Sequence, residues 1–389
     1  MGISMPNLLG TDHFGIYVHW PFCAAKCPYC DFNSHVASHI DHRTWADAYV
    51  SEIHRLRATI GARTVTSIFF GGGTPSLMDP HTVSDTISAI QREFGVANDV
   101  EITLEANPTS SEANKFRDFQ LAGVNRVSIG VQSLRDSDLK RLGRQHTAAE
   151  AISTVTMARD IFPSVSFDLM YGRQNQSLEA WDAELHEALS FTPDHISLYQ
   201  LTVEPSTAFG RLYDNGKLNG LPNDDLSYEL FERTQSICSD HGLMQYEVSN
   251  FARSGHMSRH NRTYWRYQEY AGIGPGAHGR LYLNNAACAT ETELSPETWL
   301  SVAQHHNTSP AQTLSRISSR DQSVEMLLMG LRLHEGVEIE RWLGAQDAVD
   351  VAKVDLLEQD GLLRRSPSHV ALTPAGRPLL NAILREIIK

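Results

Sequence analysis

The chain has 389 residues and a formal net charge of −13, with 41% hydrophobic and 20% charged residues. This length exceeds what one ordinary core needs and predicts a large domain with a smaller one, and the composition is typical of a soluble globular protein. The acidic balance argues against nucleic-acid binding, which needs a basic face. No apolar run approaches the ~20 residues that span a bilayer, so we expect no direct membrane insertion.

The N-terminal segment and the cysteines bear on the cellular compartment of the protein. Residues 1–10 lack the basic and apolar stretches of a signal peptide. Of the five cysteines, three are clustered and needed as thiolates, which predicts a reducing environment. We therefore expect a cytoplasmic protein. Cys238 and Cys288 have no partner motif and are expected to be ordinary buried thiols.

Short apolar strands alternate with amphipathic helices over the first two-thirds of the chain. Strands are predicted at 15–20, 65–70, 100–105, 126–131, 164–170 and 195–201. Helices are predicted at 45–60, 80–94, 111–122, 148–161 and 178–190. This order predicts an α/β fold of six parallel β/α units with right-handed crossovers. In such a fold the site lies at the carboxyl ends of the strands.

The pattern changes after residue 201. We expect a loop at 203–209, a helix at 224–241, a strand at 245–249 and a site-building loop at 253–279, which is rich in Gly, His and aromatic residues. Helices at 320–333, 339–343 and 349–360, a two-stranded wing at 362–365 and 369–372, and a final helix from Pro374 resemble a winged-helix tail. Without a basic face, this tail is expected to pack or to cover a substrate. The predicted domains are 1–205, 206–317 and 318–389.

Three cysteines lie within eight residues: Cys23, Cys27 and Cys30. Three thiolates can hold three irons of a [4Fe–4S] cube and leave the fourth iron open to a substrate. Zinc is an alternative, but structural zinc wants four ligands and usually a second C-x2-C pair. His19 and His35 flank the cysteines and could complete a metal site, and a redox disulfide is a third possibility.

Polar and glycine residues follow several predicted strands. Gly72, Gly73 and Thr74 come after the second strand, where the absence of a Cβ allows a ligand to approach the backbone. Polar side chains occur at or shortly after the ends of the next three strands, namely Glu105, Gln132, Arg144 and Asp168. One such residue would more often cap a helix, but four in register predict a binding site.

These motifs resemble the radical S-adenosylmethionine (SAM) superfamily, whose C-x3-C-x2-C signature has an aromatic residue where this chain has Tyr29. The resemblance implies a partial (β/α)6 barrel and a [4Fe–4S] cluster held by Cys23, Cys27 and Cys30. It also implies that SAM chelates the open iron and is cleaved by an electron from the cluster. The positions that match SAM contacts are Tyr17, Gly72, Gly73, Thr74, Glu105, Gln132, Arg144 and Asp168.

Further motifs across the chain, from residue 17 to residue 279, resemble the coproporphyrinogen dehydrogenase (HemN-like) branch. Three departures point to the haem chaperones of that branch. Phe32 stands where the dehydrogenase has a further cysteine, and only 22 residues precede Cys23. The H-N-x-x-Y-W block at 260–265 is similar to the chaperones.

The H-N-x-x-Y-W block is consistent with haem. A neutral imidazole such as that of His260 ligates iron, and the faces of Tyr264 and Trp265 suit a porphyrin. The Tyr264 phenolate, His256 or His278 could also serve. A His-Asn pair in a loop is more often a hydrogen-bonding corner, however, and a Tyr-Trp pair is more often core. The hypothesis is that His260, with Tyr264, ligates haem.

The resemblance implies a haem chaperone with a radical SAM [4Fe–4S] core. It would bind haem, taken from a haem donor protein, and deliver it to haem-requiring membrane respiratory proteins. One alternative is an enzyme, the oxygen-independent coproporphyrinogen III dehydrogenase, which makes protoporphyrinogen IX by radical oxidative decarboxylation. Another is a radical SAM enzyme with a different substrate. Whether SAM is cleaved in the working cycle is open.

Overall fold

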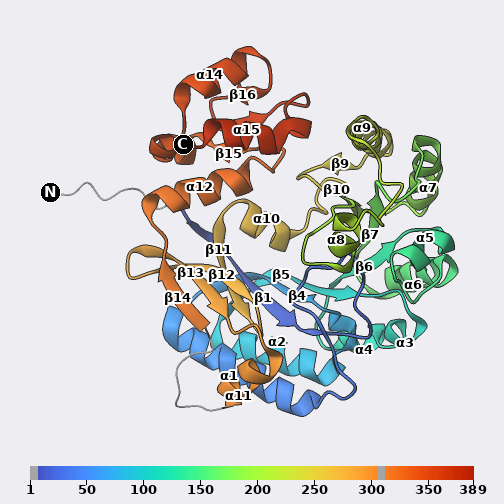
Figure 1. The fold of residues 1–389 in the computed structure, drawn as a ribbon. Coiled ribbons are helices and arrows are strands. Elements are labelled where there is room, and N and C mark those ends of the chain that lie inside the picture. The colour runs from blue at the N-terminus through green and yellow to red at the C-terminus, as the bar shows by residue number, and fades with distance from the viewer. Residues whose placement is uncertain (1–7, 305–311) are drawn as a thin grey trace.

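One twelve-stranded sheet frames the protein in the computed structural model, which describes residues 8–304 and 312–389 (Figure 1). Its order is β14-β13-β12-β11-β1-β4-β5-β6-β7-β8-β10-β9. The six predicted strands are confirmed as parallel neighbours: β1 (Gly10–Trp20), β4 (Thr64–Gly72), β5 (Gly95–Ala106), β6 (Arg126–Gln132), β7 (Ser164–Tyr171) and β8 (His195–Gln200). Residues 1–7, within the segment examined for a signal peptide, and 305–311, within the predicted second domain, lie outside the description.

Helices between these strands cover the sheet. They are α1 (His42–Ile60), α2 (Pro80–Glu93), α5 (Asp136–Arg141), α6 (Ala148–Ile161) and α7 (Leu178–Ser190). The helix predicted at 111–122 is instead two short helices, α3 (Ser110–Ala113) and α4 (Phe116–Leu121). Because successive residues of a strand face opposite sides, Ile68 and Phe70 of β4 join the apolar core, whereas Ser67 and Phe69 face the barrel interior and contact His260.

The prediction that 253–279 forms a loop is wrong. This segment holds α10 (Arg259–Trp265) and β11 (Gln268–Ile273), and β11 is a seventh parallel strand, paired with β1. The antiparallel strands β12 (His278–Leu283), β13 (Ala286–Thr292) and β14 (Gln312–Arg316) extend the sheet beyond it. At the other edge, β9 (Met244–Gln245) and β10 (Asn250–Ala252) flank a non-strand segment where a strand at 245–249 was expected.

The C-terminal helices are α12 (Ser319–Gly330), α13 (Ile339–Gly344) and α14 (Val351–Gln359). The predicted wing is confirmed as the antiparallel pair β16 (Leu363–Arg365) and β17 (His369–Leu372), and β15 (Val337–Glu338) adds a third strand. The last helix, α15 (Leu380–Ile387), begins later than Pro374. The core of this domain also includes Leu8, Leu9 and Tyr267 from the barrel side. No helix in the described ranges is long and apolar enough to cross a membrane.

Candidate metal centre and cofactor site

The three clustered cysteines lie in a loop that follows β1. Cys23 belongs to β2 (Phe22–Cys23), which pairs with β3 (His35–Val36), and the Cys30 N–H donates to the Cys27 carbonyl at 3.2 Å. All three are half-buried free thiols that line a pocket of about 270 Å³. In residues 8–304 and 312–389, no three His, Cys, Asp or Glu side chains are placed to hold a single metal ion. A [4Fe–4S] cube takes one thiolate at each of three corners, whereas structural zinc takes four ligands.

The same pocket collects most of the predicted cofactor residues. Besides the cysteines, it is lined by Gly72, Gly73, Thr74, Glu105, Gln132, Arg144 and Asp168. These residues come from or follow the carboxyl halves of β4, β5, β6 and β7, as expected for a parallel barrel. Tyr17, the remaining SAM position predicted from the sequence, does not line the pocket.

The glycine segment docks directly on the cysteine loop. The Gly73 N–H donates to the Trp20 carbonyl at 2.7 Å, and the Thr74 N–H donates to the Phe22 carbonyl at 2.8 Å. A Cβ at Gly73 would lie 2.6 Å from the Phe22 carbonyl oxygen, so no side chain fits there. Gly72 has a φ of 109°, a backbone conformation that favours glycine. These glycines therefore fix the distance between the loop and the sheet.

Two donors reach the cysteine sulfurs. The Thr74 hydroxyl donates to Cys23 Sγ at 3.4 Å, and Arg144 Nη1 donates to Cys27 Sγ at 3.6 Å. Asn107 joins the two donors, because its Nδ2 donates to Thr74 Oγ1 at 3.1 Å and its Oδ1 accepts from Arg144 Nη2 at 2.5 Å. Asn107 was not predicted as a site residue; its place two residues after Glu105, before a proline, was the available signal in the sequence.

Two carboxyl groups face the pocket without a cation in contact. Burial raises the pKa of Glu105 to about 8, with Asp168 adding to the rise and the Gly72 N–H opposing it. Burial also raises the pKa of Asp168 to about 6, while hydrogen bonds from Ser197 and Ser128 and the charges of Arg126 and Arg144 oppose that rise. In the described part of the chain neither carboxylate has an ion-pair partner within 4 Å. A cationic ligand would therefore stabilise the ionised form of both carboxyl groups. SAM carries two such cations, a sulfonium and an ammonium group.

Other features of the pocket suit a bound ligand. Arg144 Nε is buried without a hydrogen-bond partner, so this guanidinium can still donate to an acceptor such as a carboxylate of a ligand. Gln132, the last residue of β6, has a φ of 68°, and strained backbone of this kind gathers at functional sites. The donor set, the cation-seeking carboxylates and the glycine cradle all fit a [4Fe–4S] cluster with SAM.

Tyr17, His260 and Tyr264 lie elsewhere. His260 is 5% exposed, its Nδ1 lies 3.3 Å from the Ser67 hydroxyl, and its ring stacks on Phe69 at 4.8 Å. Burial lowers the pKa of His260 to about 3, so the imidazole is neutral. The Tyr17 ring stacks on the His260 ring at 6.1 Å. Tyr264 is on the last turns of α10, with its ring centroid 6.1 Å from that of His260. None of the three lines the pocket of the cysteines.

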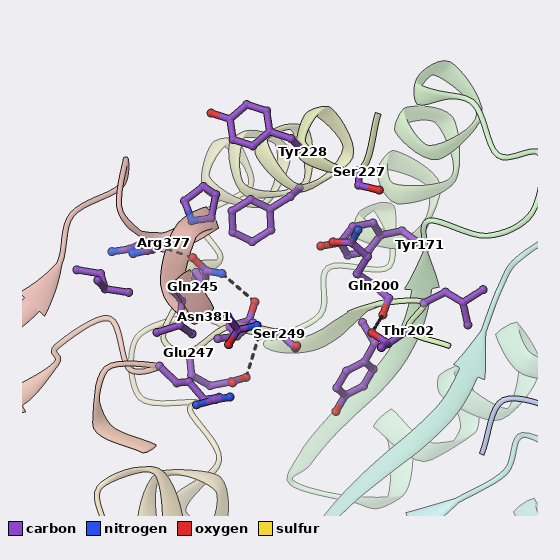
Figure 2. A pocket seen from close by; sticks show the side chains of 18 of the residues that line it. Tyr171, Gln200, Thr202, Ser227, Tyr228, Gln245, Glu247, Ser249, Arg377 and Asn381 are labelled. Atoms are coloured by element: carbon purple, nitrogen blue, oxygen red, sulfur yellow. Dashed lines mark hydrogen bonds between the residues drawn. The ribbon is translucent and has the colours of Figure 1, made fainter. Parts of the chain in front are cut away.

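Tyr199, near the end of β8, is another pocket residue that was not predicted from the sequence. This residue lines the pocket of the cysteines and also a second cavity of about 740 Å³, which lies between the barrel edge and the C-terminal domain (Figure 2). Tyr199 therefore separates two neighbouring ligand-sized spaces. Its place near the end of the strand predicted at 195–201 was the signal available in the sequence.

A parallel partial barrel with three thiols at the carboxyl ends of its strands defines the radical SAM class. The family described as "Radical SAM superfamily" matches residues 17–188, and "HemN C-terminal domain" matches residues 317–379. The solved structure of coproporphyrinogen III oxidase (HemN) from Escherichia coli, described as a radical SAM enzyme, superposes with a TM-score of 0.79. That superposition covers 97% of this chain and 90% of that one at 21% identity, and so supports the fold.

Relatives that match almost the whole chain identify a smaller family within the radical SAM superfamily. "Radical S-adenosyl methionine domain-containing protein 1, mitochondrial" of Mus musculus is 42% identical over 96% of this chain and 87% of its own length. "Heme chaperone HemW" of Escherichia coli (strain K12) is 34% identical over 95% of this chain and 96% of its own length. HemW of Haemophilus influenzae is 35% identical over 98% of each chain. The chain belongs to the radical SAM superfamily and, within its HemN-like branch, to the family that contains HemW.

Proposed function

We propose that this protein is a haem chaperone with a SAM-binding [4Fe–4S] core. The observation that carries the proposal is the near full-length similarity to proteins named heme chaperone, at 33–35% identity. A second feature supports it: Phe32, where the dehydrogenase is expected to have a further cysteine, is 58% exposed at the pocket of the cysteines. An exposed aromatic ring there cannot replace a thiol in proton or electron transfer.

Different residues of the pocket would hold the cluster and SAM. Cys23, Cys27 and Cys30 would ligate three irons, and the donors Thr74 and Arg144 would stabilise charge on the sulfurs. The cationic groups of SAM would lie near Glu105 and Asp168. When both groups are bound, the cluster supplies an electron that can cleave SAM.

The cellular role follows from the same proposal. Half-buried thiols that must remain reduced fit the cytoplasm or a similarly reducing compartment. There the protein would accept haem from a donor protein and pass it to haem-requiring membrane respiratory proteins. His260 and Tyr264 stay predicted haem ligands. Because His260 is 5% exposed, ligation through it requires α10 to shift.

The second candidate function is oxygen-independent coproporphyrinogen III dehydrogenase. The superposition with HemN favours it, but that similarity establishes the fold alone. Phe32 is the feature against it, because the expected additional cysteine is absent there.

One anaerobic experiment separates the two functions. The cluster-reconstituted protein is incubated with SAM, a reductant and coproporphyrinogen III, and porphyrins are read by chromatography; in parallel, haemin binding is followed by its Soret absorbance. We expect stoichiometric haemin binding and no decarboxylated product, with a Cys23→Ala, Cys27→Ala, Cys30→Ala variant as the cluster-free control. Protoporphyrinogen that depends on the three cysteines would overturn the chaperone proposal, as would a full-length protein that does not bind haemin.

A further inference from the structure

A second cavity in the described part of the chain has no role in the site above. It measures about 740 Å³, within the range of small-molecule pockets. Figure 2 shows one wall with Tyr171 and Gln200 from the ends of β7 and β8, and the facing wall with Gln245 and Arg377. The helix α9 (Asp224–Asp240) closes one side with Ser227 and Tyr228 (Figure 2). The cavity therefore needs both the barrel and the C-terminal domain.

Two arginines of the C-terminal domain face this cavity, Arg332 and Arg377. Both are half-buried, and in the described ranges neither forms an ion pair within 4 Å. Two unpaired cations are unusual in a cavity of an acidic protein and favour an anionic ligand. The carboxylate of Glu247 also lines the cavity, but it accepts hydrogen bonds from the Asn250 amide and the Ser249 N–H and is 3% exposed. Asp224 lies on its α9 side.

Both guanidinium groups are held in position. Arg377 donates to Gln245 Oε1 at 3.2 Å and to His334 Nδ1 at 2.7 Å. Arg332 donates to the Leu328 carbonyl and lies over the Trp265 ring, 5.6 Å from its centroid. A cation over an aromatic face is attracted to it and loses freedom. These contacts leave part of each planar fork available to a carboxylate.

Aromatic residues line the barrel side and the α9 side of the cavity. Tyr171 and Tyr199 come from the barrel, and Tyr228 and Phe231 come from α9. Flat apolar faces of this kind suit a planar ring system. Tyr199 is 40% exposed and also lines the pocket of the cysteines, so a ligand that fills the cavity would end beside that pocket.

We propose that the cargo haem binds in this cavity, with its two propionates at Arg332 and Arg377 and its opposite edge toward Tyr199. This inference rests on the proposed function and adds the position and the anchors of the ligand. It also gives the H-N-x-x-Y-W block a different role from iron ligation: Trp265, its last residue, supports Arg332 from behind.

The test is a haemin titration of the full-length, cluster-loaded protein, read by Soret absorbance. Ser227→Trp fills the cavity and leaves both arginines in place, and we expect it to weaken haemin binding at least tenfold. The matched control is Ser236→Trp, an exposed serine on the same helix, nine residues further and so on its opposite face. The control should bind haemin like the wild type, and both variants should retain SAM binding.

The anchors are tested with haemin dimethyl ester, which lacks the two carboxylate charges. The wild type should bind the ester about tenfold or more weakly than haemin, and this preference should disappear in an Arg332→Gln, Arg377→Gln variant. Equal haemin affinity in the wild type, Ser227→Trp and the double variant, together with loss of binding in His260→Ala, would place haem at α10 and overturn the inference. A wild type that binds no haemin would instead refute the proposed function itself.

Discussion

Glu105 illustrates how a buried acid can prepare a site for a cation. Its folded-state pKa is about 8 against an ordinary value of 4.5, because burial and Asp168 disfavour its charge. The folded protein without SAM therefore holds a proton that the unfolded chain has released at neutral pH. Such a carboxyl lowers stability progressively as pH rises from about 4.5 to 8. A cationic ligand reverses this effect of pH on stability, because it binds the deprotonated form of Glu105.

The first prediction concerns Glu105→Gln. SAM affinity of the wild type should rise between pH 6 and 8 as Glu105 loses its proton, and the variant should bind about tenfold or more weakly at pH 8 with a flatter pH profile, because one charge-assisted contact is lost. Isothermal titration calorimetry at several pH values measures both. Glu179→Gln, at an exposed acid on α7, is the control.

The same substitution should stabilise the protein without SAM. At pH 8 the neutral amide removes the cost of a buried acid that tends to ionise, so the thermal midpoint should rise by about 2 °C or more. The difference should shrink as the pH falls and vanish below the unfolded-state pKa of 4.5. A lower midpoint at pH 8 would show that the Glu105 charge is compensated in the unliganded protein and would contradict the assignment.

The second prediction concerns Asn107, which holds the two donors to the cysteine sulfurs. Hydrogen bonds to cluster sulfurs raise the reduction potential. Asn107→Ala should therefore lower the potential by about 40 mV for each ~1 kcal/mol of hydrogen bonding lost. A redox titration followed by electron paramagnetic resonance measures the shift. Asn114→Ala, at an exposed amide nearby, should leave the potential unchanged; an unchanged potential in Asn107→Ala at full cluster content would exclude the bridging role.

At the scale of structural elements, the glycine segment after β4 can be tested directly, because it leaves no space for a side chain at Gly73. Gly73→Ala places a Cβ against the Phe22 carbonyl at 2.6 Å, so either the cysteine loop or the strand end must move. We expect lower iron and sulfide content after reconstitution and at least tenfold weaker SAM binding. Gly95→Ala is the matched control, since its Cβ would meet no atom closer than 3.4 Å; iron content equal in the two variants would show that the cradle tolerates displacement.

The strands that the sequence predicted correctly share one property. β1 and β4 to β8 are apolar runs separated by helical segments, so periodicity alone finds them. β11 was missed because Gln268–Ile273 lies between an aromatic segment and the Gly-Pro-Gly turn at 274–276, where loop signals dominate. Its neighbour β1 decides its conformation through tertiary pairing, which no local pattern encodes.

The candidate site divides in the same way. Residues at strand ends, such as Glu105 and Asp168, could be named because parallel strands end at one edge of the barrel. Asn107 and Tyr199 could not, because their importance depends on distances: one joins two donors, and the other lies between two cavities. His260 is the opposite case. Its motif predicts a haem ligand, but its ring is packed against Phe69 inside the barrel.

In the whole molecule, Arg341 of α13 connects the C-terminal domain to the barrel. Its guanidinium donates to three backbone carbonyls across that interface, those of Leu8, Arg266 at 2.6 Å and Tyr267 at 3.2 Å. Neighbouring Tyr267 and Leu8 belong to the core of the C-terminal domain. This arginine therefore sets the position of the wall that carries Arg332 and Arg377.

Arg341→Ala should loosen this interface while leaving the barrel intact. We expect faster hydrogen–deuterium exchange in residues 319–387, several-fold weaker haemin binding and normal SAM binding. Arg385→Ala, whose side chain donates to the Asn381 carbonyl of its own helix, is the control. Unchanged exchange in Arg341→Ala would mean that apolar packing alone fixes the domain.

The pairing of β1 with both β4 and β11 has a consequence for biosynthesis. β4 follows β1 within about 50 residues, whereas β11 is translated about 250 residues later. At roughly 5–20 residues per second, one edge of the first strand waits about 12 to 50 seconds on the ribosome before its partner exists. During that interval the nascent chain carries an open strand edge, which can recruit other chains. Slowed translation or truncation before residue 268 should therefore produce aggregates rather than a smaller folded barrel.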